Sequence, residues 1–181
     1  MTNSPKYLET NPTNRWNLIQ MAKMIREIYD VKGNYFPIID ILNNLSLKNK
    51  LDYIVVEDDS RIFEENELAH YDFDENIIYV KESVWIEAEN DIGRSRFTLT
   101  HEFAHYLLLK VHGYGYKIVD SEPPKFKDPD WQADYLAGAL LMDFDLTKDY
   151  TVEQLIDECV VSEFAAIVHI NAANALNKSK K

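Results

Sequence analysis

The stretch RFTLTHEFAHYLLLK (residues 96–110) places two histidines and a glutamate inside a segment rich in apolar residues. The apolar residues recur at helical spacing, which predicts an α-helix with one side in the core. On such a helix His101 and His105 lie four residues apart and project from one face, with Glu102 beside them. The stretch therefore predicts a rigid helix that presents a metal-binding face.

This pattern has a specific chemical meaning. Zinc in a catalytic site is bound by three protein donors at about 2.0–2.3 Å and keeps a fourth position for water. His101 and His105 would supply two of the donors, and Glu102 could take a proton from the water and return it to a leaving amine. Such an H-E-x-x-H arrangement indicates a metalloprotease. The structural alternative is that both histidines are ordinary core or surface residues with satisfied hydrogen bonds.

The third donor is expected on the segment DPDWQADYLAGALLM (residues 128–142), because no further His or Cys lies on a convincing partner helix. Asp128 is a plausible N-cap, and Pro129 suits the first helical position. Asp130 and Asp134 then lie four apart on one helical face. Either could bind the metal while the other accepts the distal N–H of a ligating His. The helix N-terminus favours the ionised form of Asp130.

Outward from these two segments, the chain reads as one α+β domain spanning residues 1–181. We predict a small, mainly antiparallel sheet packed against a helical bundle that carries the 96–110 helix. The hairpin turn of this sheet is expected at Asp74-Glu75-Asn76, and Gly113 and Gly115 are expected to end the active-site helix. The predicted parts are N-terminal helices at about 15–46, the sheet at about 51–82, active-site helices at about 91–145 and C-terminal helices at about 151–177.

Composition and charge restrict the possible partners and location. The net charge of −12 opposes direct binding to nucleic acid, and a basic protein partner is more natural. The single Cys159 cannot form an internal disulfide, which fits a reducing compartment. The N-terminus has no apolar signal region, and the longest apolar run, YLAGALLM, is far shorter than the roughly 20 residues that span a bilayer. We therefore expect a cytoplasmic protein without membrane contact, whose oligomeric state the sequence does not indicate.

Other polar and reactive residues are expected to be structural. The remaining histidines are predicted to be structural or solvent-facing, with His112 the best further candidate for an electrophile. For the arginines before the motif we expect a solvated first turn with Arg96 in a structural ion pair. Cys159 is expected to be a small buried residue. The residues assigned to this group are His70, His112, His169, Arg94, Arg96 and Cys159. Tyr114 and Tyr116, just past the helix, are either donors to a tetrahedral intermediate or ordinary exposed tyrosines of a mobile loop, and we leave them out of the catalytic set.

The segments RSRFTLTHEFAHYLL and DPDWQADYLAGALLM, in this order, resemble the ImmA/IrrE family of metallo-endopeptidases, and VSEFAAIVHINAANAL is similar to that family's C-terminal helix. The resemblance covers about two thirds of the chain and implies a zincin-like fold. It further implies that His101, His105 and Asp130 bind Zn²⁺, that Glu102 is the general base, and that Asp134 supports a ligating histidine.

The family resemblance also implies a function. It points to a bacterial or phage protease that inactivates a helix-turn-helix repressor, here of a phage or mobile element, and a basic repressor would be attracted by the charge of −12. This sequence departs from the family in having Asp130 where Glu is usual and Asp143 where the family continues with Pro. A shorter third ligand motivates an alternative, a non-proteolytic antirepressor or antitoxin-like binding protein with the same fold.

Overall fold

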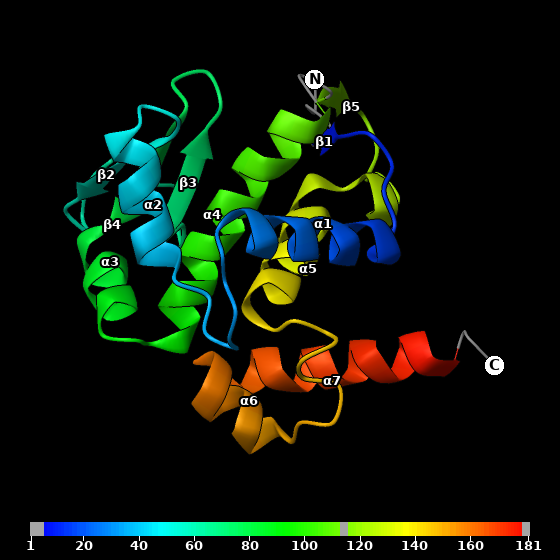
Figure 1. Ribbon diagram of the computed structural model, residues 1–181. Helices are drawn as coiled ribbons and strands as arrows, with labels where there is room; N and C mark the ends of the chain where they lie inside the picture. The colour runs from blue at the N-terminus through cyan, green and yellow to red at the C-terminus, as the bar shows by residue number, and fades with distance from the viewer. Residues whose placement is uncertain (1–5, 113–115, 179–181) are drawn as a thin grey trace.

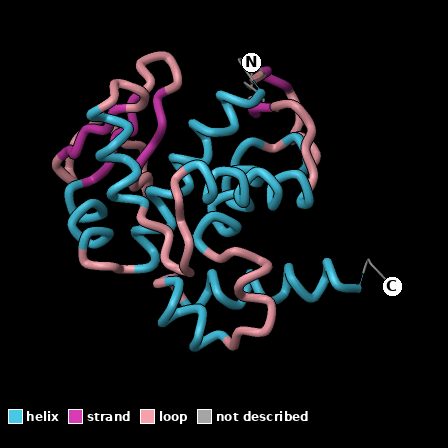
Figure 2. Tube along the Cα trace, viewed as in Figure 1, coloured by secondary structure: helices cyan, strands magenta, loops and turns pink. Residues whose placement is uncertain are grey.

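The computed structural model describes residues 6–112 and 116–178, which form seven α-helices, five strands and one 3-10 turn. Figures 1 and 2 show two groups of elements on either side of the long helix α4, with two further helices below. The helices are α1 (Arg15–Ile28), α2 (Ile38–Leu47), α3 (Glu82–Glu89), α4 (Gly93–His112), α5 (Pro129–Leu141), α6 (Val152–Cys159) and α7 (Glu163–Lys178). The strands are β1 (Tyr7–Glu9), β2 (Asp52–Val56), β3 (Ala69–Asp72), β4 (Ile77–Lys81) and β5 (Lys117–Val119).

The main sheet has three strands in the order β2-β4-β3. Strands β3 and β4 form the predicted antiparallel hairpin, and β2 lies parallel to β4. The hairpin turn is stabilised by Asp72, whose Oδ1 accepts the backbone N–H groups of Asp74 and Glu75 at 2.9 Å. This order leaves β3 at the edge, where it contacts α4 (Figure 1). The sheet therefore brings an edge strand to the helix that carries the two histidines.

Helix α4 lies at the centre of the core and packs against α5, α3 and β3. Its inward side chains Leu99, Phe103 and Ala104 are fully buried, as are Leu136 and Leu140 of α5. Burying each large apolar side chain contributes about 1.5–3 kcal/mol. The face that carries His101 and His105 is thus presented by a helix whose opposite side is fixed in the core.

Helix α5 is held at its C-terminal end by the buried Arg26 of α1. The guanidinium of Arg26 donates to the carbonyl oxygens of Leu140 and Gly33, and its Nε lies 3.9 Å from Oδ2 of Asp143. Asp143 also accepts the backbone N–H groups of Asp145 at 2.8 Å and Leu146 at 3.1 Å through Oδ1. The aspartate that departs from the family pattern therefore caps the turn after α5 in this chain.

The α+β architecture is confirmed, and two of the three strand pairs among the described residues are antiparallel. The capping aspartate of α5 is also as predicted, and α6 begins with a capping box formed by Thr151 and Gln154. Three elements were not predicted: α3, and the pair formed by β1 and β5. The predicted end of α4 at Gly113 and Gly115 lies outside the described residues, and the helix is described up to His112.

The prediction of a solvated first turn around Arg96 is wrong, because this side chain is completely buried. Its Nη2 donates to the Phe36 carbonyl at 2.8 Å and its Nε to the Val160 carbonyl at 3.2 Å. The expected structural ion pair is present, with Asp91 Oδ1 3.3 Å from Nη1. Arg96 thus joins α4 to the loop before α2 and to the α6–α7 corner. This role could not be predicted from local sequence, because its hydrogen-bond acceptors lie in distant segments.

The α6–α7 corner approaches the start of α4 very closely. Val160 adopts a left-handed conformation with φ of 54°, which is rare for a β-branched residue. At Gly93 a side chain would place its Cβ 2.4 Å from the backbone carbon of Val161, so only glycine fits there. The corner is fixed by this contact and by the hydrogen bond from Arg96 to Val160.

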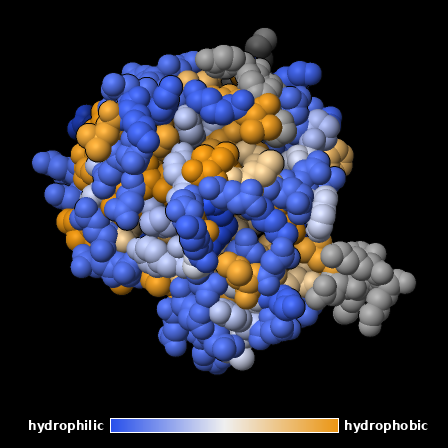
Figure 3. Space-filling model, viewed as in Figure 1, coloured by the Kyte–Doolittle hydropathy of each residue, from blue (hydrophilic) through white to orange (hydrophobic). Residues whose placement is uncertain are grey.

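Within residues 6–112 and 116–178, no single helix combines the length and apolar character needed to cross a membrane. Helices α6 and α7 satisfy that test only as a pair, and the chain bends by 119° between them. The visible face in Figure 3 is mainly hydrophilic, with hydrophobic patches scattered among charged and polar residues.

His169 gives a prediction for the pH dependence of stability. It is buried on α7, and since the Thr147 hydroxyl donates to the Asp143 carbonyl, the His169 Nε2–H must donate to Thr147. Burial lowers the pKa of His169 to about 4, against 6.5 when unfolded. The unfolded chain therefore binds the extra proton first, and about 3 kcal/mol of stability should be lost as pH falls from 6.5 to 4.

The His169→Gln variant keeps a donor for Thr147 and removes the titration. Urea unfolding at several pH values should show a smaller loss of stability for this variant than for the wild type between pH 6.5 and 4. Other acidic groups titrate in both proteins, so the difference isolates His169. Parallel pH profiles would show that this imidazole is not the titrating group.

Candidate metal centre

Helices α4 and α5 bring the predicted ligands together. His101 and His105 project from α4, and Asp130 and Asp134 project from α5, which packs against it. Asp128 caps α5 by accepting the backbone N–H groups of Asp130 at 3.0 Å and Trp131 at 3.4 Å. The cap and Pro129 fix where α5 begins, and so place Asp130 in its first turn.

The donor atoms of three residues converge. The Nε2 atoms of His101 and His105 lie 3.0 Å apart, and Asp130 Oδ1 lies 3.3 Å from the His105 Nε2. One potential ligand atom from each of these residues lies within 4.8 Å of the others. The imidazoles are mostly buried, with side-chain exposures of 20% for His101 and 16% for His105, whereas the Asp130 carboxylate is 78% exposed. The cluster is therefore fixed on one side and open to solvent on the other.

Asp134 determines the tautomer of His101. Its Oδ1 lies 2.8 Å from the His101 Nδ1, and a carboxylate can only accept, so Nδ1 carries the proton. In the neutral imidazole this leaves a lone pair on Nε2, the atom that faces His105 and Asp130. Carboxylates play this role behind the histidine ligands of many metal sites.

Glu102 lies beside the cluster and is almost fully buried. Its Oε2 accepts the backbone N–H of Tyr71, at the edge strand β3, at 2.8 Å. Burial raises the pKa of this carboxyl, although the two neighbouring histidines and the Tyr71 hydrogen bond act in the opposite direction. The side chain is thus positioned by the sheet and has a higher proton affinity than an ordinary glutamate.

The pKa directions of His101 and Asp130 indicate attraction between the imidazoles and the neighbouring carboxylates. Burial lowers the pKa of His101, but the hydrogen bond to Asp134 and the surrounding carboxylates outweigh it, so that pKa is raised. The hydrogen bond with His105 lowers the pKa of Asp130 in spite of partial burial. Asp130 is consequently ionised at neutral pH, the state required of a metal ligand.

Tyr116 was not placed in the predicted catalytic set, yet it lies close to the cluster. Burial and the negative charge of Asp130 raise the pKa of its phenol to about 12, so it is protonated at neutral pH. It could donate a hydrogen bond to an oxygen beside the cluster. Its place just past the active-site helix made this role one of two alternatives, but the segment around it has no regular periodicity from which its position could be derived.

The other residues predicted to be structural make local contacts. His70 precedes Tyr71 on β3, its Nδ1 lies 3.4 Å from Glu67 Oε2, and its charge helps to lower the pKa of Glu102. His169 is buried against Thr147. Cys159 is buried, as predicted, and Arg94 is exposed. Tyr114 and the side chain of His112 lie outside the described residues.

Comparison with known proteins agrees with this architecture. The solved structure of a Mycobacterium tuberculosis transcriptional regulator superimposes with a TM-score of 0.54 at 12% identity, a likeness of fold alone. The alignment covers 83% of this chain and 45% of the regulator, so this chain spans less than half of that protein. No curated protein sequence matches this chain significantly.

The sequence model of the IrrE N-terminal-like domain, peptidase M78, matches residues 54–172, about two thirds of the chain. The chain therefore belongs to this family of metallopeptidases.

Proposed function

We propose that this chain is a zinc-dependent endopeptidase. The observation that carries the proposal is the convergence of His101 Nε2, His105 Nε2 and Asp130 Oδ1 beside the buried carboxyl of Glu102. Membership of the peptidase M78 family supports the same reaction class.

The donor set suits zinc. Two imidazole nitrogens and one carboxylate oxygen are the ligands of many catalytic zinc sites. A separation of 3.0 Å between the two Nε2 atoms is compatible with both contacting one ion at about 2.0–2.1 Å. A zinc ion held by these residues would acidify a water molecule and polarise the peptide carbonyl.

The residues of the chain provide the proton transfers and the orientation. Glu102 takes the proton of the attacking water on a carboxylate oxygen, because it is buried beside the three converging donor atoms. It then delivers the proton to the nitrogen of the leaving amine. The Tyr71 N–H holds Oε2 in place, and Asp134 keeps His101 in the required tautomer.

The metal site is tested by the metal content of wild type and Asp130→Ala, purified without added metal and measured by elemental mass spectrometry. We expect about one zinc per chain in the wild type and a strong loss in the variant, because an uncharged methyl group replaces one of three donors. Asp149→Ala, which changes an aspartate whose side chain is 86% exposed, is the control for nonspecific effects. Equal zinc in wild type and Asp130→Ala would assign the third ligand to another residue, with Asp134 next to be tested.

For the substrate, we propose a basic helix-turn-helix repressor of a phage or mobile element. The charge of −12 would accelerate its encounter with this chain, and the similarity of fold to a transcriptional regulator supports a link to gene control. The test is incubation of the zinc-loaded protein with a candidate repressor at rising salt. Cleavage that slows as salt increases is expected, whereas an uncleaved repressor would exclude that candidate.

A second candidate function is repressor binding without cleavage. It is favoured by the third ligand, because Asp130 is a short and largely exposed carboxylate. A ligand that binds metal weakly would be tolerated where catalysis is not required. The Glu102→Gln variant considered in the Discussion separates these two functions.

A further inference from the structure

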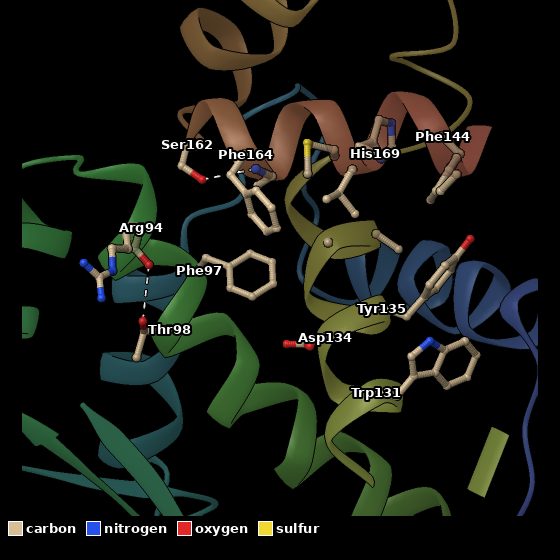
Figure 4. A pocket seen from close by; sticks show the side chains of 16 residues that line it. Arg94, Phe97, Thr98, Trp131, Asp134, Tyr135, Phe144, Ser162, Phe164 and His169 are labelled. Atoms are coloured by element: carbon tan, nitrogen blue, oxygen red, sulfur yellow. Dashed lines mark hydrogen bonds between the residues drawn. The ribbon is translucent and has the colours of Figure 1, made fainter. Parts of the chain in front are cut away.

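An apolar pocket of about 460 Å³ lies between α4, α5 and α7. Figure 4 shows Phe97 of α4 and Phe164 of α7 extending into the space between the helices, with Asp134 of α5 pointing toward α4. The volume is within the range of pockets that hold small ligands, about 300–1,000 Å³. The aromatic and sulfur-containing side chains of the lining are Phe97, Trp131, Tyr135, Met142, Phe144 and Phe164.

The pocket adjoins the candidate metal centre. Asp134 lines the pocket and also accepts the Nδ1–H of His101, so one carboxylate separates the two spaces. Along α4, Thr98 of the pocket precedes His101 by three residues, about 4.5 Å of helix rise. An extended peptide advances about 3.3 Å per residue. A peptide bound at the cluster would therefore bring a neighbouring side chain to the pocket within one or two residues.

Most of the side chains that line the pocket are uncharged, and Arg94 and Asp134 are the charged ones. Burial lowers the pKa of the lining residue His169 to about 4, so its imidazole is neutral at neutral pH. Gly138 contributes no side chain, and a Cβ placed there would have no heavy atom within 4 Å. The pocket is thus mainly apolar and has room for a bulky side chain beside Gly138.

We propose that this pocket determines substrate specificity by binding a large apolar side chain, such as Phe, Leu or Met, located one or two residues from the scissile bond. The proposal rests on the proposed peptidase function. A pocket of this kind typically discriminates between large and small apolar side chains by about 10- to 200-fold in kcat/KM.

The test is cleavage of a random peptide library by the zinc-loaded protein, with the products identified by mass spectrometry. A large apolar residue should be enriched at one fixed position beside the cleaved bond. In Gly138→Leu the new side chain occupies the pocket, and the enrichment should fall at least tenfold. Gly33→Leu is the matched control, because Gly33 also has no heavy atom within 4 Å of an added Cβ and does not line the pocket. It should keep the wild-type preference.

A binding experiment distinguishes failure of this inference from failure of the proposed function. N-acetyl-phenylalanine amide is titrated into zinc-loaded Glu102→Gln, and amide shifts are followed by NMR. We expect amide shifts that are confined to the pocket residues and that disappear in the double variant Glu102→Gln, Gly138→Leu. This result would support binding of a large apolar side chain even if no peptide is cleaved. Cleavage without an enriched apolar position, or enrichment unchanged in Gly138→Leu, would overturn the proposal. A dimer of the wild type that Gly138→Leu dissociates would also overturn it, by identifying a second copy as the occupant.

Discussion

Glu102→Gln should lose peptide cleavage by about 100- to 10,000-fold while its zinc content stays at the wild-type level. The amide has the size of the carboxylate, and its oxygen can still accept the Tyr71 N–H, so the fold of the site is preserved. It cannot take a proton from the attacking water. Cleavage of a susceptible peptide and metal content are measured on the same samples.

The control for this variant is Glu65→Gln, which changes an exposed glutamate in the loop before β3 and should cleave as the wild type does. Full activity of Glu102→Gln would place the general base elsewhere and would refute the proposed mechanism. A repression assay in cells distinguishes cleavage of the repressor from binding without cleavage. If Glu102→Gln relieved repression as effectively as the wild type, binding would be the operative activity.

Arg96→Met should lower the free energy of unfolding by about 3 kcal/mol or more. Methionine can fill part of the volume but donates no hydrogen bond. The carbonyl oxygens of Phe36 and Val160 would lose their donor, and the contact of the guanidinium with the Tyr35 ring, 4.0 Å away, would also be lost. The midpoint of urea unfolding reports the change.

Arg94→Met is the matched control for stability, because Arg94 is on the same helix but exposed. Its free energy of unfolding should differ from the wild type by no more than about 0.5 kcal/mol. If both variants lost the same stability, the effect would come from the charge of the helix end. If neither variant lost stability, the buried hydrogen bonds of Arg96 would make no net contribution to the free energy of unfolding.

The spacing of residues on single helices could be interpreted from sequence because it depends on local geometry. His101, Glu102 and His105 lie on one helix, and the Asp128 cap and Pro129 determine where the partner helix begins. The distances between the helices could not be derived in this way. Which aspartate faces which histidine depends on how α5 packs against α4, and the residue reasoning alone left Asp130 and Asp134 interchangeable. The assignments of metal ligands remain predictions until metal is measured.

The missed features depend on contacts between distant parts of the chain. Helix α3 has only eight residues, too short for a clear periodicity, and it is stabilised by packing against α4. Strands β1 and β5 have three residues each and exist as strands because they pair. The burial of Arg96 likewise depends on carbonyl groups from two other segments. None of these partners is visible in a local pattern.

The pairing of β1 with β5 has a consequence for the order of folding. The backbone N–H of Thr10 donates to the Lys127 carbonyl at 2.8 Å, and the Gln132 side chain on α5 donates to the Asn11 carbonyl, 121 residues away in sequence. Residues 7–11 therefore find their partners only after the chain has closed a loop of more than 100 residues, and contacts of such long range slow folding. We expect the start of α5 to reach its native position late during refolding. Recovery of metal affinity would then lag behind the recovery of helical circular dichroism.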